Sequence, residues 1–317
     1  MQRFEMAFGM RSFFDIRTDT DQYSKGWIKY MLNSEKIAVI TDSCADISKE
    51  WRSRYHIFVL PLIIRCEDGE HHDGVDITSR DVYKRLETEL PKTSTPSGED
   101  IERLLTEVKK QGFTKAVAVM LSGGLSGTVN HLRLAAEETD GLEVAVFDSH
   151  SGSIGIGATA IMAAEYIEQG MGFEDVKKRV KKLIGQTHIF FSVDTLEHLK
   201  KGGRIGKVTA MAGRLLNIKP ILSVDRNDGE IYTASKVRGH KAVARKLQML
   251  VKEVYESGRP YNLMIADGGV PEEGDELERE MKALFKDYHH FIRVEIGATL
   301  SVYIGSGVLG AAIQYID

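Results

Sequence analysis

The 317-residue sequence has few of the features that mark secreted, membrane or nucleic-acid-binding proteins. Its two cysteines, Cys44 and Cys66, are too few for a disulfide framework, which favours a cytoplasmic location. No run of 18 apolar residues occurs, so we expect no membrane span, and charges scattered among the first 17 residues argue against a signal peptide. A net charge of −4 and the lack of a clustered basic helix predict no nucleic-acid partner.

The chain is long enough for two domains, each with its own core. Short apolar runs alternate with helical patterns over residues 36–186, which predicts an N-terminal α/β domain with a parallel doubly wound sheet. Residues 187–317 include the hairpin signal Asn227-Asp228-Gly229 and predict a C-terminal α+β domain with a mixed or antiparallel sheet. Residues 1–35 form an extension. No linker separates the halves, so we expect a close domain interface, where small-molecule sites tend to lie.

Several local patterns predict particular elements. Lys36–Ser43, Lys115–Leu121 and Glu143–Phe147 are expected strands, and a capping box at Ser97 and Asp100 begins a helix. Phe58–Ile64 is a further expected strand, interrupted by Pro61. We interpret Glu67–Asp76 as a polar loop and residues 296–310 as a glycine-rich stretch.

The segment Leu121-Ser-Gly-Gly-Leu-Ser-Gly-Thr128 joins an expected strand to an expected helix. Free N–H groups at a helix start favour an anion, and glycines allow its close approach. Hydroxyls also follow two other strands, at Ser43 and Ser149, and ligands of open α/β sheets lie at the carboxyl ends of strands. Taken singly, each of these residues suits a helix cap equally well.

Motifs for catalysis are mostly absent from the sequence. The 121–128 segment is neither a G-x-S-x-G elbow nor a Walker A loop, and no cysteine–histidine spacing suits zinc. The adjacent His71, His72 and Asp73 are better explained as exposed loop residues than as metal ligands. A binding protein is therefore favoured. Two alternatives stay open: an enzyme or binding protein for a small polar carboxylate or phosphorylated metabolite, and a regulatory module using the extension. The enzyme would use Ser122, Ser126 or Asp42, with His150 as the best base.

Seven motifs, in order from about residue 36 to the C-terminus, resemble those of the DegV family. They are Ile37-Ala-Val-Ile-Thr-Asp-Ser43, Thr93-Ser-Thr-Pro-Ser97, Leu121-Ser-Gly-Gly-Leu-Ser-Gly-Thr128, Phe147-Asp-Ser149, Leu199-Lys-Lys-Gly-Gly-Arg-Ile205, Lys219-Pro-Ile-Leu222 and Gly305-Ser-Gly307.

The resemblance implies a two-domain protein that binds one long-chain fatty acid, C16–C18, without catalysis, cofactor or metal. In some members the fatty acid is presented to a separate fatty-acid kinase, and Arg204 falls where a basic residue is associated with kinase docking. Carried over by motif, the expected head-group residues are Asp42, Ser43, Thr93, Ser94, Ser122, Gly123, Gly124, Ser126, Tyr303, Gly305 and Ser306.

Two of these positions depart from the family pattern. Gly123 stands where a second serine is usual, and Tyr303 where a histidine is usual. A lost hydrogen bond costs about 1 kcal/mol, whereas burying about 15 methylenes contributes a gross term near 12 kcal/mol. We therefore expect lipid binding to persist and the departures to act on carboxylate positioning.

Overall fold

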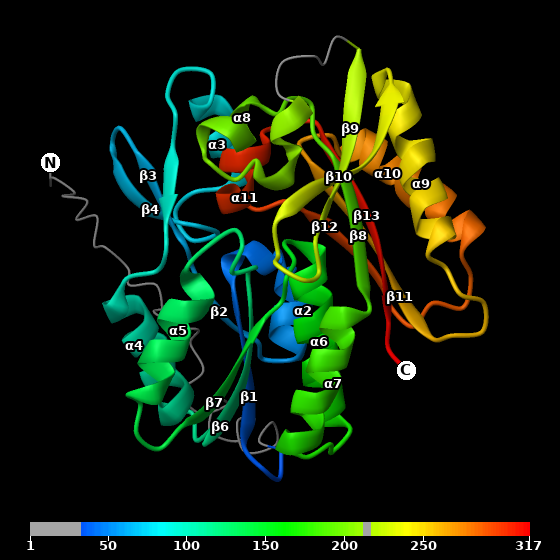
Figure 1. The fold of residues 1–317 in the computed structure, drawn as a ribbon. Coiled ribbons are helices and arrows are strands. Elements are labelled where there is room, and N and C mark those ends of the chain that lie inside the picture. Colours follow the sequence, from blue (N-terminus) through cyan, green and yellow to red (C-terminus); the bar gives the residue numbers. More distant parts are fainter. Residues whose placement is uncertain (1–32, 212–216) are drawn as a thin grey trace, which may run out of the picture.

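The computed structural model describes residues 33–211 and 217–317, so nearly all of the predicted 1–35 extension lies outside the described residues. Within them the chain forms a parallel four-stranded sheet, a mixed six-stranded sheet and a small antiparallel three-stranded sheet (Figure 1). The first two confirm the predicted fold class of an α/β sheet followed by an α+β unit.

The strands of the four-stranded sheet, in the order β2-β1-β6-β7, are β1 (Ile37–Asp42), β2 (Phe58–Leu60), β6 (Lys115–Met120) and β7 (Glu143–Asp148). Those of the six-stranded sheet, in the order β10-β9-β8-β13-β11-β12, are β8 (Thr187–Ser192), β9 (Ile218–Val224), β10 (Ile231–Arg238), β11 (Tyr261–Gly268), β12 (Phe291–Glu295) and β13 (Val308–Tyr315). The three-stranded sheet contains β3 (Ile63–Cys66), β4 (Gly69–His72) and β5 (Lys92–Ser94).

The α-helices are α2 (Lys49–Arg54), α3 (Ser79–Arg85), α4 (Gly98–Lys110), α5 (Thr128–Glu137), α6 (Ile154–Glu168), α7 (Phe173–Gly185), α8 (Glu197–Lys201), α9 (Val243–Glu253), α10 (Pro271–Leu284) and α11 (Ala298–Ile304). Short 3₁₀ helices are η1 (Ser43–Ala45), η2 (Gly206–Met211) and η3 (His240–Ala242). The predicted capping box at Ser97 and Asp100 begins α4, and the predicted 227–229 hairpin joins β9 to β10.

Helix α6 is the central layer of the molecule. It packs against β1 and β6 of the four-stranded sheet and against β8, β11, β12 and β13 of the six-stranded sheet, as Figure 1 shows. Every residue from Ile154 to Ile167 is consequently buried, and the helix is apolar on all sides. Helices α4 and α5 cover the outer face of the first sheet, and α9 and α10 that of the second (Figure 1).

The segment after β2 differs from the sequence expectation. Pro61 and Leu62 separate two short strands, and β2 and β3 belong to different sheets. The predicted polar loop 67–76 instead contains β4, which pairs with β3 as a hairpin. Ile64, Ile77 and Val82 from this region pack on Ala298 and Val302 of α11. An N-terminal segment thereby closes over a helix from the C-terminal half.

Two carboxyl groups, those of the buried Asp73 and the partly buried Asp46, fix the start of α11. Asp73 accepts hydrogen bonds from the N–H groups of Ala298 (3.0 Å) and Thr299 (3.1 Å), and Asp46 accepts one from Gly297 (3.0 Å). Free N–H groups at a helix start need acceptors, and negative charge is favoured there. These bonds cross between residues more than 220 positions apart, so they join the two halves of the chain.

Replacing Asp73 by alanine should lower the free energy of unfolding by about 1–3 kcal/mol, because two buried N–H groups lose their acceptor. Urea denaturation of the full chain measures this. Asp76→Ala, which removes an exposed carboxylate from the same turn, is the matched control and should cost less than half as much. Equal losses in the two variants would contradict the role given to Asp73.

Candidate functional site

A largely apolar cavity lies between the carboxyl-end loops of the four-stranded sheet and one face of the six-stranded sheet. The empty space between its walls, together with the solvent-filled space at its mouth, is about 820 Å³. Its apolar wall is formed by Leu62, Leu121, Leu125, Ile154, Ile189, Phe191, Leu199, Val224, Ile231, Ala266, Ile296, Leu300 and Ile304. Both halves of the chain contribute, so the cavity exists only when they are packed together.

Four polar residues of the cavity wall are here called the polar cluster: Thr93, Ser126, Arg204 and Tyr303. The Thr93 and Tyr303 hydroxyls are hydrogen-bonded to each other, and the Arg204 guanidinium lies 4.9 Å from the centre of the Tyr303 ring. Arg204 Nε donates to the carbonyl oxygen of Leu125 (3.2 Å), next to Ser126. A cation and three hydroxyls beside an apolar cavity suit a ligand with one anionic end.

The end of α8 positions Arg204. Gly203 has φ +72°, the N–H of Arg204 donates to the Leu199 carbonyl (2.9 Å), and that of Gly203 donates to the Lys200 carbonyl (3.1 Å). This is a Schellman motif, which glycine favours because the position is left-handed. Arg204 Nη1 donates to the Gly202 carbonyl (2.7 Å), whereas Nη2 makes no hydrogen bond to the described residues.

The glycine-rich loop after β6 serves the contact between the two halves. Ser122 is buried and donates to the Gly229 carbonyl of the β9–β10 hairpin (2.8 Å). A Cβ on Gly124 would lie 2.6 Å from the Asp228 carbonyl oxygen, so only glycine allows this approach. The N–H of Gly123 donates to both oxygens of Asp148, and a Cβ there would meet the same carboxylate at 2.5 Å. A serine at position 123 would therefore require Asp148 to move.

The other expected head-group residues lie outside the cavity lining. Asp42 is fully buried and accepts hydrogen bonds from the N–H groups of Leu121 (2.6 Å) and Cys44 (3.0 Å). Ser43 accepts one from the Leu62 N–H, and the buried Ser94 hydroxyl has no hydrogen-bond partner within residues 33–211 and 217–317. Gly305 ends α11 with φ +65°, and Ser306 is exposed in the turn before β13.

Ser153 is a cavity residue that the sequence did not single out. It precedes α6 with φ 49° and ψ −125°, and its hydroxyl donates to Asp46 (2.6 Å). Positive φ is uncommon for serine, so this backbone is held by its surroundings. Burial raises the pKa of Asp46 well above its ordinary value.

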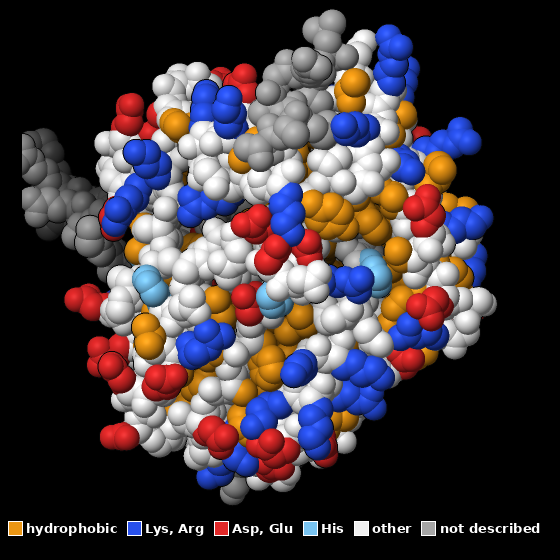
Figure 2. All heavy atoms as spheres, in the orientation of Figure 1, with side chains coloured by type: hydrophobic (Ala, Val, Ile, Leu, Met, Phe, Trp, Pro, Cys, Tyr) orange, Lys and Arg blue, Asp and Glu red, His pale blue; other side chains and the backbone are white. Residues whose placement is uncertain are grey.

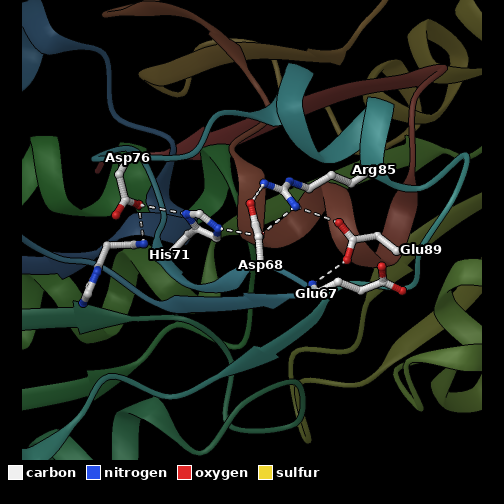
Figure 3. Close-up of polar contacts among 7 residues, drawn as sticks. Glu67, Asp68, His71, Asp76, Arg85 and Glu89 are labelled. Atoms are coloured by element: carbon white, nitrogen blue, oxygen red, sulfur yellow. Dashed lines mark hydrogen bonds and ion pairs between the residues drawn. The ribbon is translucent and has the colours of Figure 1, made fainter.

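His71 of β4 lies in an ion-pair network rather than in a free ligand set (Figure 3). Arg85 donates to both oxygens of Asp68 (2.9 and 2.6 Å), and His71 contacts Asp68 (3.0 Å) and Asp76 (4.0 Å). Arg85 and His71, through their hydrogen bonds and charge, hold the pKa of Asp68 below its ordinary range. Cys66 lies beside this network, but the arginine already occupies the carboxylate that a metal would need.

The architecture defines a two-domain α/β protein with an apolar cavity between its domains. The chain belongs to the DegV family, whose model matches residues 36–315. A DegV domain-containing protein of Clostridium acetobutylicum is 37% identical over 279 residues, covering 88% of this chain and 99% of the relative.

Solved structures show the same fold. A fatty-acid-binding DegV family protein from Thermus thermophilus aligns with a TM-score of 0.82 and 30% identity, covering 88% of this chain and 99% of its own. A stearic-acid-binding protein from Eubacterium ventriosum aligns with a TM-score of 0.79 and 26% identity, covering 88% and 98%. Among the described residues, no helix has both the length and the apolar character to cross a bilayer. Figure 2 shows charges of both signs interspersed on the face in view.

The burial of Asp42 predicts a pH-dependent effect of its replacement. Burial raises the pKa of Asp42 to about 7, against the lowering effect of its two N–H donors, whereas an unfolded aspartate titrates near pH 4. The folded state therefore binds the proton more tightly, and this group's contribution to stability is lost as the pH rises from about 4 through 7. We therefore expect the wild type to be more stable relative to Asp42→Asn at low pH. The difference between their free energies of unfolding should be at least about 1 kcal/mol larger at pH 5.0 than at pH 7.5.

Urea denaturation at the two pH values measures this difference. Asp140→Asn, at an exposed position, is the control and should show the same gap at both. A gap for Asp42→Asn that does not change with pH would mean that the carboxylate stays ionised throughout.

Proposed function

We propose that this protein binds one long-chain fatty acid, with the acyl chain in the interdomain cavity and the carboxylate at the polar cluster. The observation that carries the proposal is the combination of a long apolar wall with a single arginine beside hydroxyls. The fatty-acid-binding relatives with the same fold support it.

The energetics favour a ligand with a long apolar part. Burying some 15 methylenes contributes a gross term of about 12 kcal/mol, from which the costs of ordering and association are subtracted. A small polar metabolite would leave most of the apolar wall without contacts. The carboxylate contributes less to affinity, but the fixed position of Arg204 gives the ligand a defined orientation.

Binding is a better account of the cavity than catalysis. Ser153 on its wall has a carboxyl partner, because its hydroxyl donates to Asp46 (2.6 Å). Burial raises the pKa of Asp46, and its two oxygens already accept hydrogen bonds from the Ser153 hydroxyl and the Gly297 N–H, so its geometry is that of a structural group rather than of a free general base. A polar carboxylate or phosphate as the ligand is the alternative, and the experiments below distinguish it.

We further propose that the bound carboxylate is offered to a separate fatty-acid kinase. The support is the resemblance at the Gly-Gly-Arg-Ile turn. Arg204 lies half-buried in the cavity wall, so a kinase would meet it together with the ligand's carboxylate rather than as an isolated surface charge.

Mass spectrometry of the purified protein, native and then after organic extraction, tests the proposal. We expect one C16–C18 fatty acid per chain. In Gly310→Val this adduct should be lost or replaced by a shorter acid, because a Cβ at Gly310 would lie 3.6 Å from the Phe191 Cβ and 3.7 Å from the Ala266 Cβ, on the face that lines the cavity. Valine is well accepted by strands, so the fold should persist.

Gly98→Val, at an exposed helix start with open space around it, is the control and should retain the wild-type adduct. A clean apo mass with no uptake of added palmitate or oleate would refute fatty-acid binding. Uptake of a small phosphorylated or carboxylated compound instead would favour the alternative ligand.

Arg204→Gln should weaken palmitate binding by about 10-fold or more, since hydrogen bonds to charged groups contribute about 1.5–3 kcal/mol. Binding of the long-chain alcohol of equal length should be unchanged, because it lacks the charge. Titration calorimetry with delipidated protein measures both. Lys201→Gln makes the same charge change at an exposed position of α8 and should affect neither ligand. Equal weakening for acid and alcohol would contradict the head-group role.

A further inference from the structure

One end of α6 carries a buried carboxylate that the lipid cavity does not use. Of the two glutamates on this otherwise apolar helix, Glu168 is exposed whereas the Glu165 side chain is only 11% exposed. A buried carboxylate is costly unless it is paired. Glu165 lies about 16 Å along the helix axis from Ile154, which lines the cavity, so it belongs to a separate site.

Two adjacent histidines meet this carboxylate. His289 Nε2 lies 2.8 Å from Glu165 Oε1, and His290 Nε2 lies 2.6 Å from Glu165 Oε2. Neighbouring side chains on a strand point to opposite faces, but β12 begins only at Phe291, and the bend before it turns both rings toward Glu165. The ring centres are 4.2 Å apart, and the three candidate ligand atoms lie within 4.8 Å of one another.

We propose that Glu165, His289 and His290 form a binding site for a divalent transition metal of the zinc type, which joins α6 to the segment before β12. Two imidazole nitrogens and a carboxylate are a ligand set that zinc uses in proteins, with a fourth position left to water. The His289 side chain is 38% exposed, which leaves that position open to solvent.

The required adjustment is small. Ligand atoms of a tetrahedral zinc site with bonds of about 2.1 Å lie about 3.4 Å apart, so the nitrogens and oxygens must separate by roughly 0.6–0.8 Å. Side-chain rotation supplies this without moving the helix. The metal would also balance the buried charge of Glu165.

Surrounding residues orient the ligands. Gln169 Nε2 donates to Glu165 Oε1 (3.1 Å), and the backbone N–H of His290 donates to Asn262 Oδ1 (3.1 Å). Trp51 packs edge-on against the His290 ring, with 5.0 Å between ring centres, and Tyr55 stacks on Trp51. Such outer contacts fix ligand orientation in metal sites. Among the described residues no arginine forms an ion pair with Glu165, whereas Arg85 pairs with Asp68 in the Cys66–Asp68–His71 group.

Metal binding by the full chain, stripped with EDTA and dialysed, tests the proposal. We expect one equivalent of Zn²⁺ by titration calorimetry, and visible absorption bands of a tetrahedral or five-coordinate complex with Co²⁺. Glu165→Gln and His289→Ala should each weaken Zn²⁺ binding at least 10-fold. Because His289 is partly exposed, its replacement leaves no buried hole and keeps the test valid if the glutamate variant folds poorly.

His71→Ala is the matched control, since it removes a histidine from the other carboxylate–histidine group, and it should leave Zn²⁺ binding unchanged. Zinc should also raise the thermal midpoint of the wild type but not that of His289→Ala. No Zn²⁺ uptake at 100 μM metal, or uptake that survives both site variants or is lost in His71→Ala, would overturn the proposal. None of these readouts depends on lipid, so their outcome is independent of the proposed function.

Discussion

The burial of α6 on all sides is the constraint on which the structure depends. A helix packed between two sheets has no polar face, and the residues around it must fit its surface closely. A Cβ on Gly157 would lie 2.5 Å from the Ala45 carbonyl oxygen, so glycine is required where the helix approaches η1. Since both sheets use the same helix as a wall, neither half of the chain can complete its core without the other. The cavity at the start of α6 and the histidines near its end both depend on that shared layer.

The second constraint is the placement of α11. Asp46 and Asp73 hold its first N–H groups, and its last turn carries Tyr303, which contacts Thr93 and Arg204. The hydrogen bonds of these two carboxyl groups at the start of the seven-residue helix therefore help to place Tyr303 in the polar cluster. The hydroxyl loops at the strand ends act largely through such contacts. Ser122 and Gly124, for example, hold the hairpin of the other half against the loop, and the wall of the cavity follows from that closure.

The sequence predicted the features that arise from local patterns. Alternating strands and helices, the Ser97–Asp100 capping box and the 227–229 hairpin all follow from short-range rules, and the structure has each of them. It did not predict β13, because glycines weaken a strand signal and only the neighbouring strands explain its burial. Nor could it predict that Asp73 would cap a helix 225 positions away, or that Ser153 would line the cavity. The roles of Asp73 and Ser153 depend on residues far away in the sequence, which local periodicity cannot predict.

The position of β13 has a consequence for how the protein is made. This strand lies between β8 and β11, and it pairs with both along most of its length. The ribosome synthesises β13 after β8 and β11. Until β13 is made, each of these two strands has an unpaired edge. Open strand edges invite pairing with other chains. Gly310, which lines the cavity, belongs to the same strand. Before β13 is inserted, the nascent chain therefore lacks part of the cavity wall as well as the central strand of the sheet.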